Sequence, residues 1–153
     1  MEINKTVLKK VAGSFATGVT IINAKDNAGK LAGMTVSSFV SVSLDPPLVS
    51  FFIDNNAKLL GQIKVGDTLS ISILAANQQS ISNHFAGYPD PEKAVEFDKS
   101  EGFPIIKNAL GWYVTEVLEL NPTGDHYMVL CAVEKLGRNE DISPLLYFSG
   151  KYL

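Results

Sequence analysis

Short runs of β-branched and aliphatic residues, separated by turn residues, are the feature that most constrains the fold of this chain. Residues 68–74 alternate hydroxyl residues with leucine and isoleucine at a period of two, which predicts a half-buried strand. Similar runs predict further strands at 19–24, 30–36, 39–43, 48–53, 111–120, 126–136 and 145–149. Helices do not alternate regularly with these strands, which argues against a parallel sheet. We therefore predict a mainly β fold, an antiparallel β-barrel with peripheral helices.

Short helices are predicted at three places. Residues 5–16 carry apolar side chains on one side and Lys9 and Lys10 on the other. This predicts an amphipathic helix that ends near Gly18 and packs against the sheet. Residues 57–65 and 78–85 also have helical spacing.

Residues 86–108, between the last helix and the strand at 111, are rich in glycine, proline and charge. This composition predicts a long, partly ordered loop that borders a site.

The composition limits the class of protein. Hydrophobic residues make up 46% and charged residues 19% of the 153 residues, which predicts a single compact domain over 1–153. A net charge of -3, with no basic cluster longer than Lys9-Lys10, argues against nucleic-acid binding. No apolar run reaches about 18 residues, so no membrane span is expected. The one cysteine, Cys131, lies in an apolar run and is expected to be a buried free thiol, which favours a cytoplasmic location.

Several common site patterns are absent. Residues 13–18 have the glycine spacing of a P-loop but lack its lysine, and no dinucleotide-binding glycine motif follows a strand. Two histidines and one cysteine, far apart in the sequence, argue against a zinc site, so no metal is predicted. No serine lies in a nucleophile elbow.

Small hydroxyl residues are concentrated between apolar neighbours at Thr35, Ser37, Ser38, Ser41 and Ser43. One interpretation is the solvated face of an ordinary strand. The other is a flavin site, because the ring edge and ribityl chain of a flavin need short hydroxyls and free backbone N–H groups. The residue pattern alone leaves both open.

Four segments in order resemble a known family: Phe15-Ala16-Thr17-Gly18-Val19-Thr20, the run from Met34 to Pro47, His84-Phe85-Ala86-Gly87, and Gly124-Asp125-His126. Together they resemble the flavin reductases with an FMN-binding split barrel. The similarity is greatest to the reductase components of two-component aromatic monooxygenases of the 4-hydroxyphenylacetate type. It covers about residues 5 to 150.

The resemblance implies a homodimeric, Greek-key antiparallel split barrel. It also implies an enzyme that transfers hydride from NADH to FMN or FAD and supplies reduced flavin to a partner monooxygenase. The flavin would be bound by residues Gly33, Met34, Thr35, Val36, Ser37, Ser38, Phe39, Phe52, Asp54, Asn55, Asn56, Lys58, His84, Phe85 and Ala86.

Within this set the resemblance places Lys58 against the FMN phosphate, where an ammonium makes a charge-assisted contact. Asp54 is expected to turn toward the ring or to cap the following helix. Phe85 is either a wall of the ring site or a core aromatic. The nicotinamide would be bound by His126, Tyr147, Phe148, Ser149 and Gly150.

No catalytic acid or base is predicted, because hydride transfer to a flavin needs stacked rings rather than proton transfer by the protein. FMN-binding electron carriers, flavin-storage proteins and pyridoxamine-phosphate oxidases use the same barrel and remain alternatives. The residues do not decide between NADH and NADPH, or between FMN and FAD.

Overall fold

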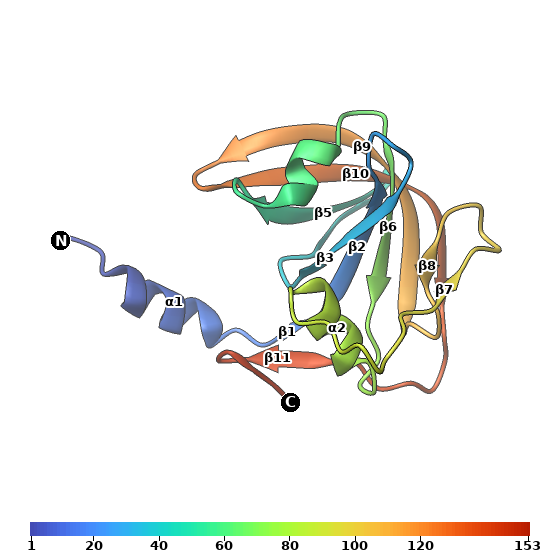
Figure 1. Ribbon diagram of the computed structural model, residues 1–153. Coiled ribbons are helices and arrows are strands. Elements are labelled where there is room, and N and C mark those ends of the chain that lie inside the picture. The colour runs from blue at the N-terminus through green and yellow to red at the C-terminus, as the bar shows by residue number, and fades with distance from the viewer.

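A computed structural model describes residues 1–153 and shows a strongly curved antiparallel sheet with short helices at its margins (Figure 1). The main sheet has seven strands in the order β3-β2-β6-β9-β10-β5-β4. In that order the strands are Leu31–Val36, Thr20–Lys25, Thr68–Ile73, Gly111–Thr123, His126–Arg138, Pro47–Asp54 and Val40–Leu44. Each neighbouring pair is antiparallel, so the predicted mainly β, antiparallel fold is confirmed.

Two small sheets complete the strands. β1 (Thr17–Gly18), β11 (Leu146–Phe148) and β12 (Lys151–Tyr152) form one of them. β7 (Phe97–Asp98) and β8 (Ile105–Ile106) form the other, inside the segment predicted to be a partly ordered loop. This segment is more ordered than predicted, because its apolar side chains are buried against the sheet: Phe103, Ile105 and Ile106.

The core lies on both faces of the sheet. A cluster of 13 buried residues fills the inside of the curve and includes Ile22 and Phe51. A second cluster lies on the opposite face and includes Ile21 and Leu145. Because neighbouring residues of β2 belong to different clusters, this strand is buried on both faces from Thr20 to Ala24.

Cys131 belongs to the inner cluster and has no exposed surface, as predicted. Burial raises the pKa of its thiol to about 11. The thiol therefore stays protonated at neutral pH and serves as a small apolar side chain.

The first helix differs from its prediction. α1 (Lys5–Gly13) begins after Asn4, whose side chain accepts hydrogen bonds from the N–H groups of Thr6 and Val7. It ends earlier than the predicted end near Gly18. It extends away from the barrel (Figure 1) and contains no buried residue. The prediction that it packs against the sheet is wrong for the single chain, since its apolar side, with Val11 65% exposed, has no partner there.

The other two helices are short. α2 (Gln79–Phe85) packs on β2 and β3, close to its predicted position. The helix predicted at 57–65 is only the 3₁₀ turn η1 (Lys58–Gln62), because the chain turns directly after it where Lys64 N–H donates to the Asp67 carboxylate. Neither α-helix is long and apolar enough to cross a membrane.

Candidate functional site

The side chains of β3 alternate between the inner core and α2. Met34 and Val36 contact the inner cluster, whereas Gly33 and Thr35 face α2. A Cβ atom at Gly33 would lie 2.6 Å from the ring of Phe85, so only glycine lets α2 pack this closely. The Thr35 hydroxyl donates to the backbone carbonyl of Ser82 at 2.6 Å. These contacts fix α2 on the sheet.

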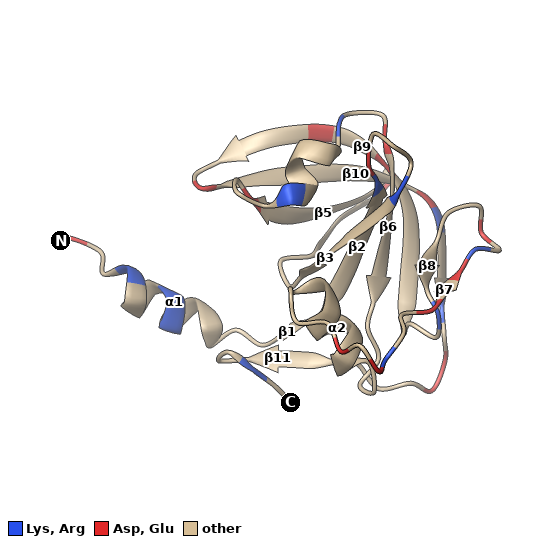
Figure 2. Cartoon of the chain, viewed as in Figure 1, with Lys and Arg blue, Asp and Glu red and all other residues tan.

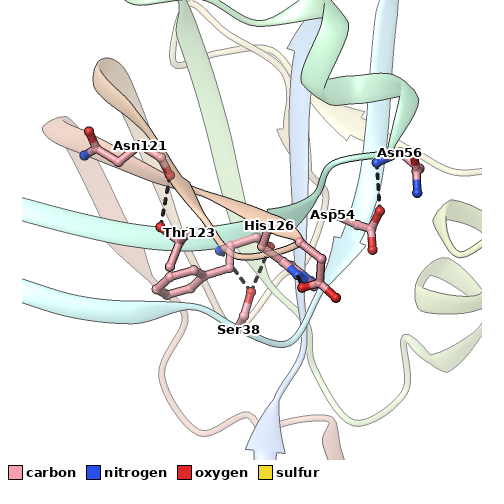
Figure 3. A network of polar contacts seen from close by, with 8 residues as sticks. Ser38, Asp54, Asn56, Asn121, Thr123 and His126 are labelled. Carbon is pink, nitrogen blue, oxygen red and sulfur yellow. Dashed lines mark hydrogen bonds and ion pairs between the residues drawn. The ribbon is translucent and has the colours of Figure 1, made fainter. Parts of the chain in front are cut away.

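The chain leaving β3 is joined to β5 by Ser38. Its hydroxyl donates to the carbonyl of Phe52 at 2.9 Å and accepts from the N–H of Phe52 at 3.0 Å (Figure 3). The hydroxyls of Thr35 and Ser38 are therefore used by the fold. The exposed hydroxyl of Ser37, between them, is the one available to a ligand.

Two cavities meet at Ser37. The larger cavity, about 510 Å³, is lined by Phe15, Ala16, Thr17, Gly18, Val19, Thr20, Ser37, Ser38, Phe39, Val40, Phe52 and Ile73. The smaller cavity, about 200 Å³, is lined by Val19, Thr35, Ser37, Ser82, Ala86, Tyr147 and Tyr152. The larger one falls within the range of about 300–1,000 Å³ that is typical of small-molecule sites. Apolar walls with a few hydroxyls suit a flat, partly polar ring.

One end of the larger cavity carries an unused polar atom. The Oγ1 atom of Thr17 is buried and has no hydrogen-bond partner in the chain. Thr17 lies in β1 opposite Tyr147 of β11, which lines the smaller cavity. Because buried polar atoms nearly always have a partner, this hydroxyl points to a ligand in the larger cavity.

The other end of the larger cavity continues onto the outer face of β5 and β10. Phe52 pairs with Met128, and Asp54 pairs with His126 two residues along, so these four side chains share one face of the sheet. Asp54 and His126 of this set are labelled in Figure 3. Two residues of strand span about 7 Å. His126 therefore lies close to the Phe52 end of the cavity.

The side chain of Asp125 fixes the orientation of the His126 ring. Its Nδ1 lies 2.6 Å from the Asp125 carboxylate, and its side chain is 41% exposed. This hydrogen bond holds the pKa of Asp125 below its ordinary value. The turn is tied to β5, since the N–H of Asn55 donates to the carbonyl of Asp125 at 3.0 Å.

The segment after β5 lies beyond the cavity. The Asp54 carboxylate accepts from the N–H of Asn56 at 2.7 Å, so it forms a local turn before η1 and caps no helix residue (Figure 3). Lys58 is the first residue of η1, and it is exposed. Asn55 and Asn56 are exposed beside it.

The residues at the end of α2 have different surroundings. Ala86 lines the smaller cavity. Phe85 covers Gly33 and contacts His84 edge to face, with ring centroids 4.8 Å apart, so it packs as a core aromatic. The Nδ1 atom of His84 is buried without a partner.

The last strands close the smaller cavity. Tyr147 and Tyr152 meet edge to face at 5.3 Å, and the Tyr152 hydroxyl lies 2.6 Å from that of Ser82. Phe148 is 39% exposed, and Ser149 and Gly150 form the turn between the strands with positive φ angles. The structure thus places Tyr147 in the wall of the smaller cavity, whereas His126 lines neither cavity and lies two residues along the sheet from Phe52 in the larger one.

Comparison with known proteins gives the family. The model of the flavin reductase-like domain matches residues 12–153, almost the whole chain. The chain belongs to the flavin reductase-like family. An NADH-dependent flavin reductase of a Rhodococcus species is 37% identical over 99% of this chain and 86% of its own length. The reductase component of 4-hydroxyphenylacetate 3-monooxygenase from Thermus thermophilus is 34% identical over 97% of this chain and 95% of its own length.

A solved structure agrees with these relatives. The flavin reductase PheA2 in its native state matches with a TM-score of 0.91 and 36% identity, over 99% of this chain and 97% of that one. The family resemblance predicted from the four segments is confirmed, as is the likeness to the 4-hydroxyphenylacetate type of reductase.

Five parts of the cavity walls lie outside the residues predicted for the site. They are the segment Phe15–Thr20, Val40, Ile73, Ser82 and Tyr152. The first had a signal, since it is one of the four segments that carry the resemblance. Ser82 and Tyr152 had none, because their contact joins residues 70 positions apart.

Proposed function

We propose that this chain is an NAD(P)H:flavin oxidoreductase that uses NADH to reduce FMN or FAD. The observation that carries the proposal is the meeting of the two cavities at Ser37, in a chain of the flavin reductase-like family. A hydride transfer between two flat rings needs two adjoining sites that hold the rings about 3–3.5 Å apart. Its relatives are named as NADH-dependent flavin reductases and NADH:FMN oxidoreductases, which supports this donor and acceptor.

The residues of the larger cavity fit a flavin. When bound, the flavin supplies the ring that accepts the hydride. Phe39 and Phe52 provide apolar walls, and the hydroxyls of Ser37 and Thr17 provide polar contacts, one of them already buried and unpartnered. Lys58, beyond the Asp54 turn, is the cation proposed for the flavin phosphate.

The nicotinamide is proposed to lie on the open side of the flavin, between Tyr147 and His126. Tyr147 offers an aromatic wall, and His126 offers a ring nitrogen whose orientation is fixed by Asp125. Neither residue needs to transfer a proton to the reacting atoms. Their role is to position the donor.

Anaerobic titration of the FMN-loaded protein with NADH tests the proposal. We expect the flavin absorbance to bleach with one equivalent of NADH. An unchanged spectrum with both NADH and NADPH would contradict a reductase and favour an FMN-binding electron carrier or a flavin-storage protein.

Replacing His126 with alanine should raise the KM for NADH about tenfold, because one oriented polar contact to the donor is lost. The Kd for FMN should stay nearly unchanged. Steady-state kinetics and FMN titration measure the two quantities. Thr123→Ala is the matched control, since the Thr123 hydroxyl only donates to the carbonyl of Asn121 in the same hairpin. An equal loss of NADH and FMN binding would place His126 in the flavin site instead.

We also propose that the chain is a homodimer. The apolar side of α1 is exposed, as are Val40 and Val42 of the edge strand β4, beside the larger cavity. A monomer rarely leaves so many neighbouring apolar residues in water, and a second copy would cover them.

Replacing Val11 with glutamate should convert the dimer to a monomer, because a charge would be buried on the apolar side of α1. The fold should be retained, as α1 contains no buried residue in the single chain. Light scattering during size-exclusion chromatography measures the mass. The control is Lys10→Glu, a glutamate on the polar side of the same helix. A dimer that persists in Val11→Glu would place the interface elsewhere.

The acceptor of the reduced flavin is proposed to be a monooxygenase. Relatives named as a monooxygenase reductase component and as the reductase subunit of an N-demethylase support this role. Product formation by a candidate oxygenase should require this chain and NADH together, and turnover without the chain would contradict the pairing. A cytoplasmic location stays a prediction, which cell fractionation can check.

A further inference from the structure

A third cavity lies between α1 and the turn that joins β11 to β12. It measures about 680 Å³ and is lined only by polar residues and glycine: Thr6, Lys9, Lys10, Gly13, Ser149 and Gly150. The N–H of Ser149 donates to the carbonyl of Gly13 at 2.9 Å, which holds the turn against the end of the helix. We call this space the basic cavity.

Its walls contain two lysines and no acidic side chain. There is no aspartate or glutamate at residues 3–14 or 142–153, the two stretches from which the walls come. Lys5, Lys9, Lys10 and Lys151 lie in these stretches, and Figure 2 shows blue segments along α1 and beside the C-terminus. The ion pairs of the chain join Lys107 to Glu96 and His126 to Asp125, so these four lysines are unpaired. The basic cavity is therefore a locally positive site in a chain whose net charge is -3.

The basic cavity is next to the proposed nicotinamide site. Tyr147, in the wall of the smaller cavity, is two residues from Ser149, which begins the turn after β11 and lies in the wall of the basic cavity. The residues of α1 that line the basic cavity lie on the opposite side of the helix from Val7, Leu8 and Val11. A second copy that covers the apolar side would leave the cavity open.

We propose that the basic cavity binds the phosphate groups of the nicotinamide dinucleotide, through the ammonium groups of Lys9 and Lys10. The inference rests on the proposed function, because it takes the dinucleotide as a substrate. The two phosphates of NADH each carry a negative charge and are joined to the nicotinamide by one ribose. This short link suits a phosphate site at the β11–β12 turn, directly after Tyr147. Ammonium groups on flexible side chains are suited to phosphate as point charges.

The test uses a double variant, Lys9→Ala with Lys10→Ala, in the full chain. Alanine is the best helix former, so α1 should persist, which circular dichroism checks. The matched control is Lys30→Ala with Lys64→Ala, which removes two exposed lysines from the β2–β3 turn and the turn after η1. Three quantities are measured for each protein. They are the Kd of ADP-ribose by calorimetry, the KM values for NADH and FMN, and the rate with 1-benzyl-1,4-dihydronicotinamide, a hydride donor without phosphate.

We expect the double variant to weaken ADP-ribose binding and to raise the KM for NADH, each roughly five- to tenfold, as loss of two partly exposed charge contacts predicts. The rate with the phosphate-free donor and the KM for FMN should match the control. An active variant with an unchanged Kd for ADP-ribose would overturn the phosphate site alone. A rise in the KM for FMN without one for NADH would assign the cavity to the flavin phosphate and overturn the dinucleotide assignment. Failure of the unmodified protein to oxidise either donor would overturn the proposed function and this inference with it.

Discussion

Replacing Ser37 with tryptophan should lower kcat/KM for NADH-driven flavin reduction by at least about 100-fold. Ser37 lines both cavities at their junction, so an indole there occupies the space in which the two rings have to meet. Displacement of reacting groups by about 1 Å is enough for a loss of this size. The residue is exposed and follows β3, so the larger side chain does not disturb the core.

The measurement is the initial rate of NADH oxidation at several flavin concentrations, with thermal unfolding as a check on the fold. Ser100→Trp is the matched control, because Ser100 is an exposed serine in the turn after β7, away from both cavities. A Ser37→Trp protein with the activity of the control would show that the rings meet elsewhere.

Replacing Gly33 with alanine should lower the free energy of unfolding by about 2 kcal/mol, the cost of adding one methyl group to a tightly packed contact. The new Cβ would lie 2.6 Å from the Phe85 ring and from the Asn23 side chain. Phe85 has to move, and α2 with it. Because Ala86 and Ser82 line the smaller cavity from α2 and its end, NADH-driven activity should fall as well.

Urea unfolding followed by circular dichroism measures the change in stability. Gly61→Ala is the matched control, since a Cβ at Gly61 would meet no atom within 4 Å. Equal stability of the two variants would mean that Phe85 adjusts without cost and that Gly33 does not fix the position of α2.

The strands of the main sheet were predictable because their patterns are local. β6 appears at 68–73 against a predicted 68–74, since alternation at a period of two needs no knowledge of its neighbours. The partner of α1 was not predictable. An amphipathic pattern shows that one side of a helix needs an apolar partner, but it does not say whether that partner belongs to the same chain.

The flavin-binding residues stay a prediction, but the roles of some of their atoms depend on the fold. Of the run from Gly33 to Phe39, the residues Thr35, Ser37, Ser38 and Phe39 line the cavities, yet the hydroxyls of Thr35 and Ser38 are taken by residues 47 and 14 positions away. Such pairings depend on the sheet order and leave no local trace in the sequence. Resemblance located the segment, and only the packing of α2 and β5 singles out Ser37 as the free hydroxyl.

The pairing of β1 with β11 has a consequence for how the protein is made. Thr17 and Tyr147 face each other, and Tyr152 reaches Ser82, so the smaller cavity is completed by strands that are synthesised after the whole of the main sheet. A nascent chain that lacks its final segment has no complete pocket, however well its barrel has formed. The proposed nicotinamide site should therefore be completed later in synthesis than the barrel, and translation products that stop short of residue 146 should not support NADH-driven flavin reduction.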